Sequence, residues 1–514
     1  MHSLLSTAAQ PVQRDQAARL PDARAIYDTL GAPGHAAMAR ATARHYLQQQ
    51  LLAADDLPDG LPEQPEDLLN WSRGSAEQVG VEYQAYLAER KNGAPCRFFT
   101  SKSHALYFLR AAAPTKLVDG SWLYSALQQW QHQRFRALIQ IYLEELGDGV
   151  EEKNHVVLYQ KLLASHGCDD WQDLDDRYFV QGAIQLALAH DNGNFLPEII
   201  GFNLGYEQLP LHLLITAYEL NELGIDPYYF TLHVTVDNGS TGHARKATDA
   251  VLQLMPRFGD SKAFYRRVRN GFRLNDLGAG TTDIIAGFDL RQELVRILCE
   301  KSVAGKNMHS DYCRIGGKSI NDWLGDKSQV PELLDKLTAT GWIQRGAPVE
   351  DSRFWRLIQS ERAEMFGVFS PYEQQVLRDW IESPVDDTGI AAPRIMSHRA
   401  AMRSIETLAD AQPRPSQPGV RGVFRRHLGL SQAQEQHVDM DLRGLEQAVA
   451  EQGSRGSAMD MLIPLMSPAN HHSAAGLMAT RLYRQLLACL ERIVLRNVTA
   501  GVTFGENYNV GNKL

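Results

Sequence analysis

Residues 138–163 read LIQIYLEELGDGVEEKNHVVLYQKLL, and this stretch decides the fold class. Apolar residues recur at spacings of three and four on both sides of the GDG run at 147–149, which is the periodicity of amphipathic helices. Glycine favours backbone conformations that end a helix, so the run predicts a break. We therefore expect two helices, with Glu145 ending the first and His155 opening the second.

The same helical spacing recurs along most of the chain, whereas strand-like alternation is sparse. The predicted fold class is therefore mainly α, with helices packed on helices rather than on a sheet. The segments with this spacing lie near 35–53, 121–146, 153–166, 178–190, 208–223 and 243–256, and an amphipathic helix closes the chain near 474–497.

With 514 residues the chain is long enough for more than one domain. Proline-bearing stretches with small polar residues predict its divisions. We expect an N-terminal helical region at 1–85, a central helical domain at 86–330 with a helical extension at 331–382, a linker or long loop at 383–422, and a C-terminal helical region at 423–514.

The composition excludes several classes of protein. Its 52 basic and 61 acidic residues give a net charge of -9, which argues against nucleic-acid binding. No apolar run is long enough to span a membrane, and the five cysteines form no C-x-x-C pair. A cytoplasmic protein that binds neither nucleic acid nor membrane is the expectation, and a homodimer is left open.

The stretch YYFTLHVTVDNGSTGHARKA at 228–247 carries the first candidate metal ligands. His233 and Asp237 are four residues apart, so a helix presents them on one face. An imidazole and a carboxylate together suit iron, although such a pair also forms ordinary structural hydrogen bonds. His243 follows six residues after Asp237, and the glycines between them permit the distortion that would turn His243 toward the same site.

Three further residues are candidates because of where they lie on the predicted helices. Glu145 and His155 flank the GDG break and could face one cavity, or they could belong to a solvated helix end. Glu207 is placed at the head of an apolar helix, where it is either a ligand or a carboxylate favoured by the helix dipole.

Five runs of the sequence resemble the heme-oxygenase-like diiron oxidase superfamily, a group of iron-containing redox enzymes that bind no heme. The runs are EELGDGVEEKNH, PEIIGFNLGYE, GIDPYYFTLHVTVDNGSTGHA, GGKSINDWLGD and MFGVFS, and the resemblance covers roughly residues 90–380. It implies a heme-oxygenase-like helical bundle, here with additional N- and C-terminal helical regions.

The resemblance also implies a set of ligands for two irons per chain. Many family members place the last histidine three residues after the aspartate, and here His243 stands six residues after it. Some members have a further acid on the first core helix, but its nearest counterpart, Asp119, is left out of the expected set. That set comprises Glu145 and His155 of the E-x9-H element, Glu207, His233 and Asp237 of the H-x3-D pair, and His243.

The expected function is a non-heme diiron oxidase or oxygenase with O2 as co-substrate. Three carboxylates offset the charge of two Fe(II) ions, and histidines complete the coordination as neutral donors. The substrate would be an amino acid, an amine or a fatty-acid-like molecule, oxidised by N-oxygenation, desaturation, hydroxylation or C–C cleavage, with an external electron donor left open. Two alternatives stay open: a metal-free oxidase of the same fold acting on a quinone-like substrate, and a non-catalytic helical binding protein.

Other residues have two interpretations each. Tyr206, Tyr228 and Tyr229 could line a substrate pocket or pack in the core, and Arg245 could pair with a substrate carboxylate or with a surface acid. The arginines at 266, 267, 269 and 273 could hold an anion or form a solvated face. His471 and His472 could bind metal or relay protons, or they could cap the helix that follows.

Overall fold

The computed structural model describes residues 22–32, 36–190, 192–237, 242–359, 365–384 and 432–499. Helices form nearly all of the regular structure in these ranges. The exception is one antiparallel hairpin of β1 (Arg314–Ile315) with β2 (Lys318–Ser319). The prediction of a mainly α fold is confirmed. The predicted linker at 383–422 lies, from residue 385 onward, outside the described residues.

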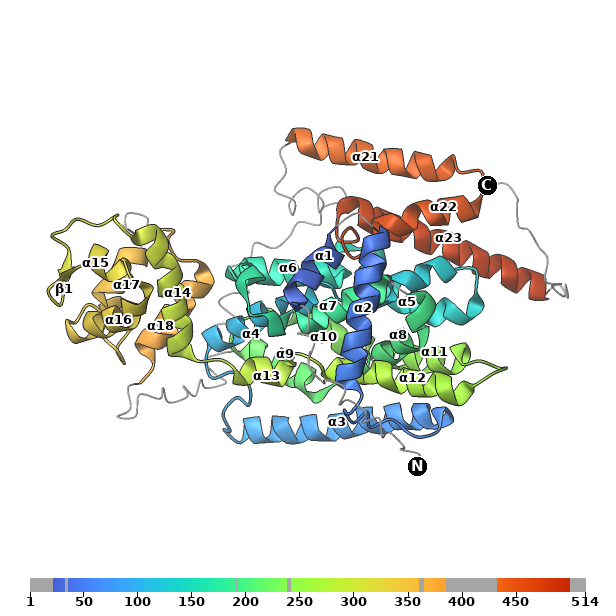
Figure 1. Cartoon of the computed structure of the whole chain (residues 1–514), viewed down its shortest axis with the longest axis horizontal. Helices are drawn as coiled ribbons and strands as arrows, with labels where there is room; N and C mark the ends of the chain where they lie inside the picture. The colour runs from blue at the N-terminus through green and yellow to red at the C-terminus, as the bar shows by residue number, and fades with distance from the viewer. Residues whose placement is uncertain are drawn as a thin grey trace, which may run out of the picture.

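Helix α7 (Val180–His190) runs through the middle of the main body (Figure 1). Its sequence, VQGAIQLALAH, is largely apolar, and residues 181–189 are all buried. Helices α1 (Ala23–Gly31) and α2 (Ala36–Ala54) pack on it from one side, and the 3-10 segment η2 (Ser121–Gln129) packs on it from another.

The other helices of the body, together with the segments between them, position the candidate site. They are α3 (Leu68–Lys91), α4 (Lys102–Lys116), α5 (Arg136–Glu145), α6 (His155–His166), α8 (Asn192–Tyr206), α9 (Leu211–Glu222), α10 (Tyr228–Val236), α11 (His243–Leu254), α12 (Ser261–Arg273) and α13 (Thr281–Ala286). Short 3-10 segments join them. The predicted helix at 121–146 is divided into η2, η3 (Gln133–Phe135) and α5.

A lobe formed by the helices from α14 to α18 stands to one side of the body (Figure 1). Helix α14 (Leu290–Gly305) packs on α15 (Ile320–Leu324), on α16 (Val330–Ala339) and on α18 (Pro371–Glu382), and α17 (Arg353–Gln359) completes the lobe. The capping box of Ser370 with Glu373 fixes the start of α18, which also contacts α4 of the body. The predicted division at residue 330 falls within this lobe, at the first residue of α16.

The C-terminal helices α21 (Gln432–Ala450), α22 (Arg455–Leu462) and α23 (Ala474–Thr499) lie along the edge of the body opposite to α3 (Figure 1). Helix α23 packs against the turn at 147–149, where Arg481 donates a hydrogen bond of 2.9 Å to the Gly149 carbonyl. Tyr142 of α5 donates one of 2.6 Å to the Met466 carbonyl. The C-terminal region therefore braces the break between α5 and α6.

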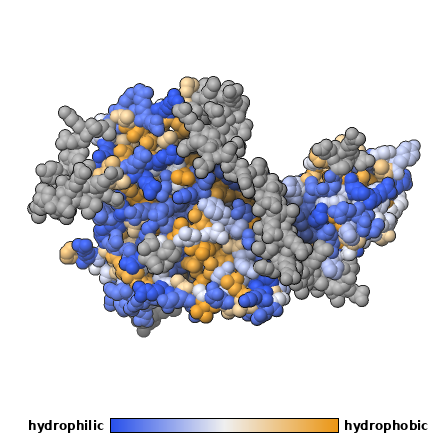
Figure 2. Space-filling model, turned by 180° about the vertical axis from the view of Figure 1, so that it is seen from behind, coloured by the Kyte–Doolittle hydropathy of each residue, from blue (hydrophilic) through white to orange (hydrophobic). Residues whose placement is uncertain are grey.

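The surface is mixed in character. Figure 2 shows that hydrophilic residues cover most of the lobe and of the outer rim on this face, while apolar residues gather toward the middle of the body. Among the described residues, no helix combines the length and the apolar composition that crossing a membrane requires.

Candidate metal centre

The break between α5 and α6 brings Glu145 and His155 together. Gly147 has φ +64°, and a Cβ there would lie 2.5 Å from the Asn154 backbone nitrogen, so this tight reversal requires glycine. Asn154 then caps α6, because its side chain accepts a hydrogen bond from the Val157 N–H. As predicted, Glu145 is the last residue of α5 and His155 the first of α6, and His155 Nδ1 lies 2.5 Å from Glu145 Oε2.

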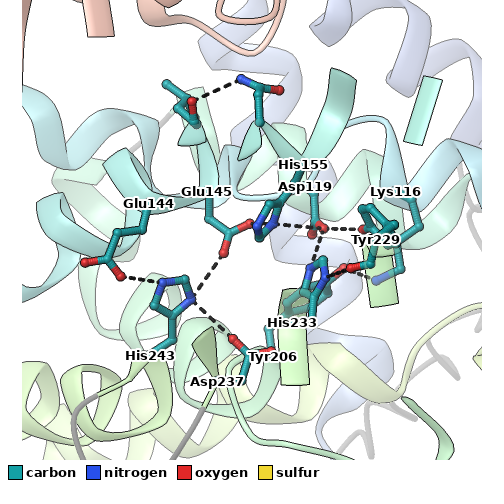
Figure 3. Close-up of polar contacts among 12 residues, drawn as sticks. Lys116, Asp119, Glu144, Glu145, His155, Tyr206, Tyr229, His233, Asp237 and His243 are labelled. Atoms are coloured by element: carbon teal, nitrogen blue, oxygen red, sulfur yellow. Dashed lines mark hydrogen bonds and ion pairs between the residues drawn. The ribbon is translucent and has the colours of Figure 1, made fainter. Parts of the chain in front are cut away.

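Asp119, His155 and His233 form one group beside Glu145, which we call the histidine-rich half of the site (Figure 3). Asp119 lies in the turn after α4, and His233 lies on α10. Asp119 Oδ2 is 3.2 Å from His233 Nε2 and 4.0 Å from His155 Nδ1. One ligand atom from each of these residues and from Glu145 can be chosen so that all four lie within 4.8 Å of one another.

Glu207, Asp237 and His243 form a second group on the other side of Glu145, the carboxylate-rich half. His243 Nδ1 lies 3.0 Å from Glu207 Oε2, 3.2 Å from Glu145 Oε1 and 3.3 Å from Asp237 Oδ1. All four residues are buried. Two oxygens of one carboxylate, that of Glu145, thus point to different halves (Figure 3).

Gly120 makes room for Glu145 in this central position. Its φ is +77°, and a Cβ there would lie 2.8 Å from the Glu145 Cβ. Any larger residue would both strain the turn and push the Glu145 side chain away from its place between the two halves.

The buried donor atoms are better suited to binding a metal than to forming hydrogen bonds with one another. Five buried atoms of the two halves and Glu145 have no hydrogen-bond partner within the described ranges: Asp119 Oδ1, Glu145 Oε2, Glu207 Oε1, Asp237 Oδ1 and His155 Nδ1. The 2.5 Å contact between Glu145 and His155 lacks hydrogen-bond geometry, so both of its atoms belong to this set. Unpaired buried polar atoms are costly, and mixed oxygen and nitrogen donors suit iron.

Outer contacts fix the orientation of two of the histidines. His233 Nδ1 lies 2.8 Å from the Tyr229 carbonyl, so Nδ1–H donates there and leaves Nε2 facing Asp119. His243 Nε2 lies 2.9 Å from Glu144 Oε2, which leaves Nδ1 facing the carboxylate-rich half. Lys246 in turn holds Glu144, with Nζ 2.5 Å from Oε1.

The two halves differ in the protons that they hold without metal. Burial lowers the pKa of His233, but the Asp119 carboxylate outweighs it and raises this pKa to about 9. Burial raises the pKa of Glu207 to about 8, and the nearby Glu145 and Asp237 carboxylates add to the effect. The pKa of His243 lies well above its usual value because four carboxylates around it outweigh its burial.

The sequence prediction named Asp119 only as the nearest counterpart of a further family acid and left it out of the expected ligand set. Asp119 stands in a turn rather than on a helix face, so no periodicity identifies it. Tyr229 donates a hydrogen bond of 2.6 Å to Asp119 Oδ2, which leaves Oδ1 unpartnered. Burial raises the pKa of Asp119, but the Lys116 ammonium and His233 outweigh it and hold this pKa at about 2, so the group is a carboxylate.

Two expectations about local structure were wrong. Glu207 does not head a helix, since its N–H donates to the Asn203 carbonyl and continues the last turn of α8, while α9 starts only after Pro210. His243 is not carried by a distorted continuation of α10. That helix ends at Val236, with Asp237 as its C-cap, and a new helix, α11, opens at His243 after the extended Gly242. The other glycine of the expected distortion, Gly239, lies outside the described residues.

Some of the remaining candidate residues lie at the site, and others lie on the surface. Arg245 pairs with Asp249, and the arginines of α12 include Arg267, paired with Glu198, and Arg269, paired with Asp59. Tyr228 is 43% exposed, whereas Tyr206 and Tyr229 lie at the site (Figure 3). His471 is buried, with Nδ1 3.3 Å from Asn154 Nδ2, so it supports the residue that caps α6.

Residues 106–275 match the family model described as iron-containing redox enzyme. This segment contains every residue of both halves of the site. Over this segment the chain is similar to the iron-containing redox enzymes, and the predicted resemblance to the heme-oxygenase-like diiron oxidase superfamily is confirmed for this segment. No curated protein and no solved structure matches the chain significantly.

Proposed function

We propose that this oxidoreductase is a non-heme diiron oxidase or oxygenase that uses O2 to oxidise a small metabolite. The observation that carries the proposal is the pair of buried ligand groups on either side of one carboxylate, Glu145. A shared carboxylate is the arrangement by which two metal ions are held close together in one site.

Seven side chains would hold the two irons. Asp119, His155 and His233 would bind one iron, Glu207, Asp237 and His243 the other, and Glu145 would bridge them. The iron pair supplies the redox chemistry that protein side chains lack, because it can exchange electrons with O2.

The surrounding residues prepare the site for that chemistry. Tyr229 orients the Asp119 carboxylate through its hydroxyl, and Glu144 keeps His243 in one tautomer. Nearly complete burial of the ligands excludes bulk water, which strengthens electrostatic interactions in the site and limits side reactions.

Oxygen consumption by the iron-loaded chain tests this proposal. The full-length protein, loaded anaerobically with Fe(II) and freed of excess metal, is expected to consume O2 in proportion to its bound iron, and the His233→Ala variant is expected to consume much less. The metal-free oxidase predicts that chelators leave any oxidase activity intact. The non-catalytic binding protein predicts neither iron uptake nor O2 consumption, and either result would overturn the proposal.

A further inference from the structure

Lys116 is a positive charge at the edge of the metal centre with no carboxylate bound to it. It is the last residue of α4, three residues before Asp119, and it is half-buried. Its Nζ donates a hydrogen bond of 3.0 Å to the Tyr206 hydroxyl and lies 5.1 Å and 5.9 Å from the ring centres of Tyr206 and Tyr229. Within the described ranges it forms no ion pair.

The other lysine beside the site, Lys246, is paired with a carboxylate. Lys246 lies next to the carboxylate-rich half, and its Nζ is 2.5 Å and 2.6 Å from the two oxygens of Glu144. That charge is therefore compensated by the chain itself. Lys116, at the opposite end of the site, contacts a phenol oxygen and two aromatic faces among the described residues (Figure 3).

Charge counting indicates what is absent at Lys116. Asp119, Glu145, Glu207 and Asp237 together balance the four positive charges of two Fe(II) ions, and ligating histidines are neutral. In the metal-free chain Lys116 compensates part of the charge of Asp119. Once the irons occupy the site, Lys116 retains one positive charge that no described residue offsets, and a partly buried charge of this kind is unfavourable unless it is paired.

The groups around Lys116 favour an anion. Helix α9 begins nearby at Leu211, and its N-terminal N–H groups receive no side-chain cap. His212 lies close to Lys116, and burial together with that ammonium lowers the pKa of its imidazole to about 4. The imidazole is therefore neutral at pH 7 and leaves the single positive charge of Lys116 in place. The turn at 208–210 is half-buried.

We propose that the Lys116 ammonium binds the carboxylate of the substrate, so that the enzyme selects small monocarboxylates. This inference rests on the proposed function, because the uncompensated charge arises only when two irons are bound. A monoanion balances the charge, whereas a dianion such as a phosphate monoester would leave an excess negative charge. Lys116 is thus a specificity-determining residue whose ligand lies beside the histidine-rich half.

Calorimetric binding of matched probes to the full-length chain tests the assignment. The probes are straight-chain carboxylates from acetate to octanoate, the corresponding neutral amides, and methyl phosphate, each titrated anaerobically before and after Fe(II) loading. We expect the best carboxylate to bind the loaded chain about tenfold or more tightly than its amide, since a charge-assisted contact replaces a neutral one. Carboxylate binding should also strengthen on iron loading.

Variants at position 116 distinguish a carboxylate that is bound by Lys116 from one that is bound directly to iron. Lys116→Met should reduce the ratio of carboxylate to amide affinity to about one, and Lys116→Arg should retain most of it. Lys161→Met is the matched control, because Lys161 pairs with Glu151 on the surface of α6 and its loss should leave the ratio unchanged. Iron content is measured in every sample to show that the site is intact.

Each outcome decides between the proposals. Iron uptake without any preference for carboxylate, or with a preference that Lys116→Met leaves intact, overturns this inference alone. Tighter binding of methyl phosphate than of every carboxylate overturns the choice of a monoanion and so the inference. Failure of the wild-type chain to bind iron overturns the proposed function together with the inference that rests on it.

Discussion

The two halves of the metal centre are built in different ways. The histidine-rich half has two imidazoles and one carboxylate, and Tyr229 orients Asp119 within it. The carboxylate-rich half has two carboxylates and one imidazole, and its outer support is the Glu144 and Lys246 pair near the surface. We infer that the first half binds iron more tightly at neutral pH, because the second must release more protons before metal can bind.

The largest effect is expected at the residue that the halves share. Replacing Glu145 with alanine removes ligand atoms from both sides, so the bound iron should fall from about two per chain to well below one. Metal analysis after anaerobic Fe(II) loading and desalting measures this. Glu152→Ala, on the exposed turn of the same break, is the control and should retain the wild-type content. An unchanged iron content in Glu145→Ala would show that Glu145 does not join the two halves.

Single-histidine variants should distinguish the halves. His243→Ala removes the only imidazole of the carboxylate-rich half, so about one iron per chain should remain, held by Asp119, His155 and His233. The reciprocal His233→Ala should weaken the other half. Iron counting together with the absorption spectrum of a Co(II) substitute reports the ligands that remain. If His243→Ala lost iron from both halves to the same extent, the two halves would not bind iron independently.

Falling pH should empty the carboxylate-rich half first. Glu207, with a pKa of about 8, and His243, with a pKa well above its usual value, both hold protons at pH 7 that metal must displace. In the histidine-rich half this applies to His233, with a pKa of about 9. Affinity should therefore rise with pH in both halves, and more steeply in the carboxylate-rich half than in the histidine-rich half. Fe(II) titrations at stepped pH measure both slopes, and identical slopes would contradict the comparison.

A smaller effect is expected from the outer support of His243. Glu144→Gln keeps a hydrogen-bonding group beside Nε2 but removes the charge, so affinity in the carboxylate-rich half should fall by about 10- to 100-fold. The histidine-rich half should be unaffected in the same titration. A matching loss in both halves would mean that Glu144 acts on the fold rather than on His243.

The smallest effect is expected at the cap of α6. Asn154→Ala removes the acceptor of the Val157 N–H and the contact with His471, which should lower the free energy of unfolding by about 1–2 kcal/mol. Chemical denaturation measures the change, and both irons should still bind. Asn154→Ser retains a capping acceptor for the Val157 N–H and is the comparison. A loss of iron that exceeds the loss of stability would assign Asn154 to the site itself.

Much of this architecture could be predicted from sequence because local rules apply to it. The GDG break, the end of α5 at Glu145 and the start of α6 at His155 follow from helical periodicity and glycine. Asp119 could not be found in this way, since its place depends on the turn after α4 and on Tyr229, which is 110 residues away. The position of His243 likewise depends on how two separate helices pack, which no spacing rule describes.

The contribution of the C-terminal region to the α5–α6 break could not be predicted from the sequence either. His471 and Arg481 reach the α5–α6 break from more than 300 residues away along the chain. Nothing in their local sequence indicates that partner. Contacts of this kind arise only when α23 has packed on the body, and they stabilise the turn that holds Glu145 next to His155.

The central claim, two irons joined by Glu145, is tested most directly by Mössbauer and EPR spectroscopy of the chain loaded anaerobically with isotopically enriched iron and then oxidised. We expect about two irons per chain in a magnetically coupled diferric pair, with no EPR signal from isolated ferric ions. One iron per chain, or two irons with the EPR signal of uncoupled ferric sites, would contradict the account.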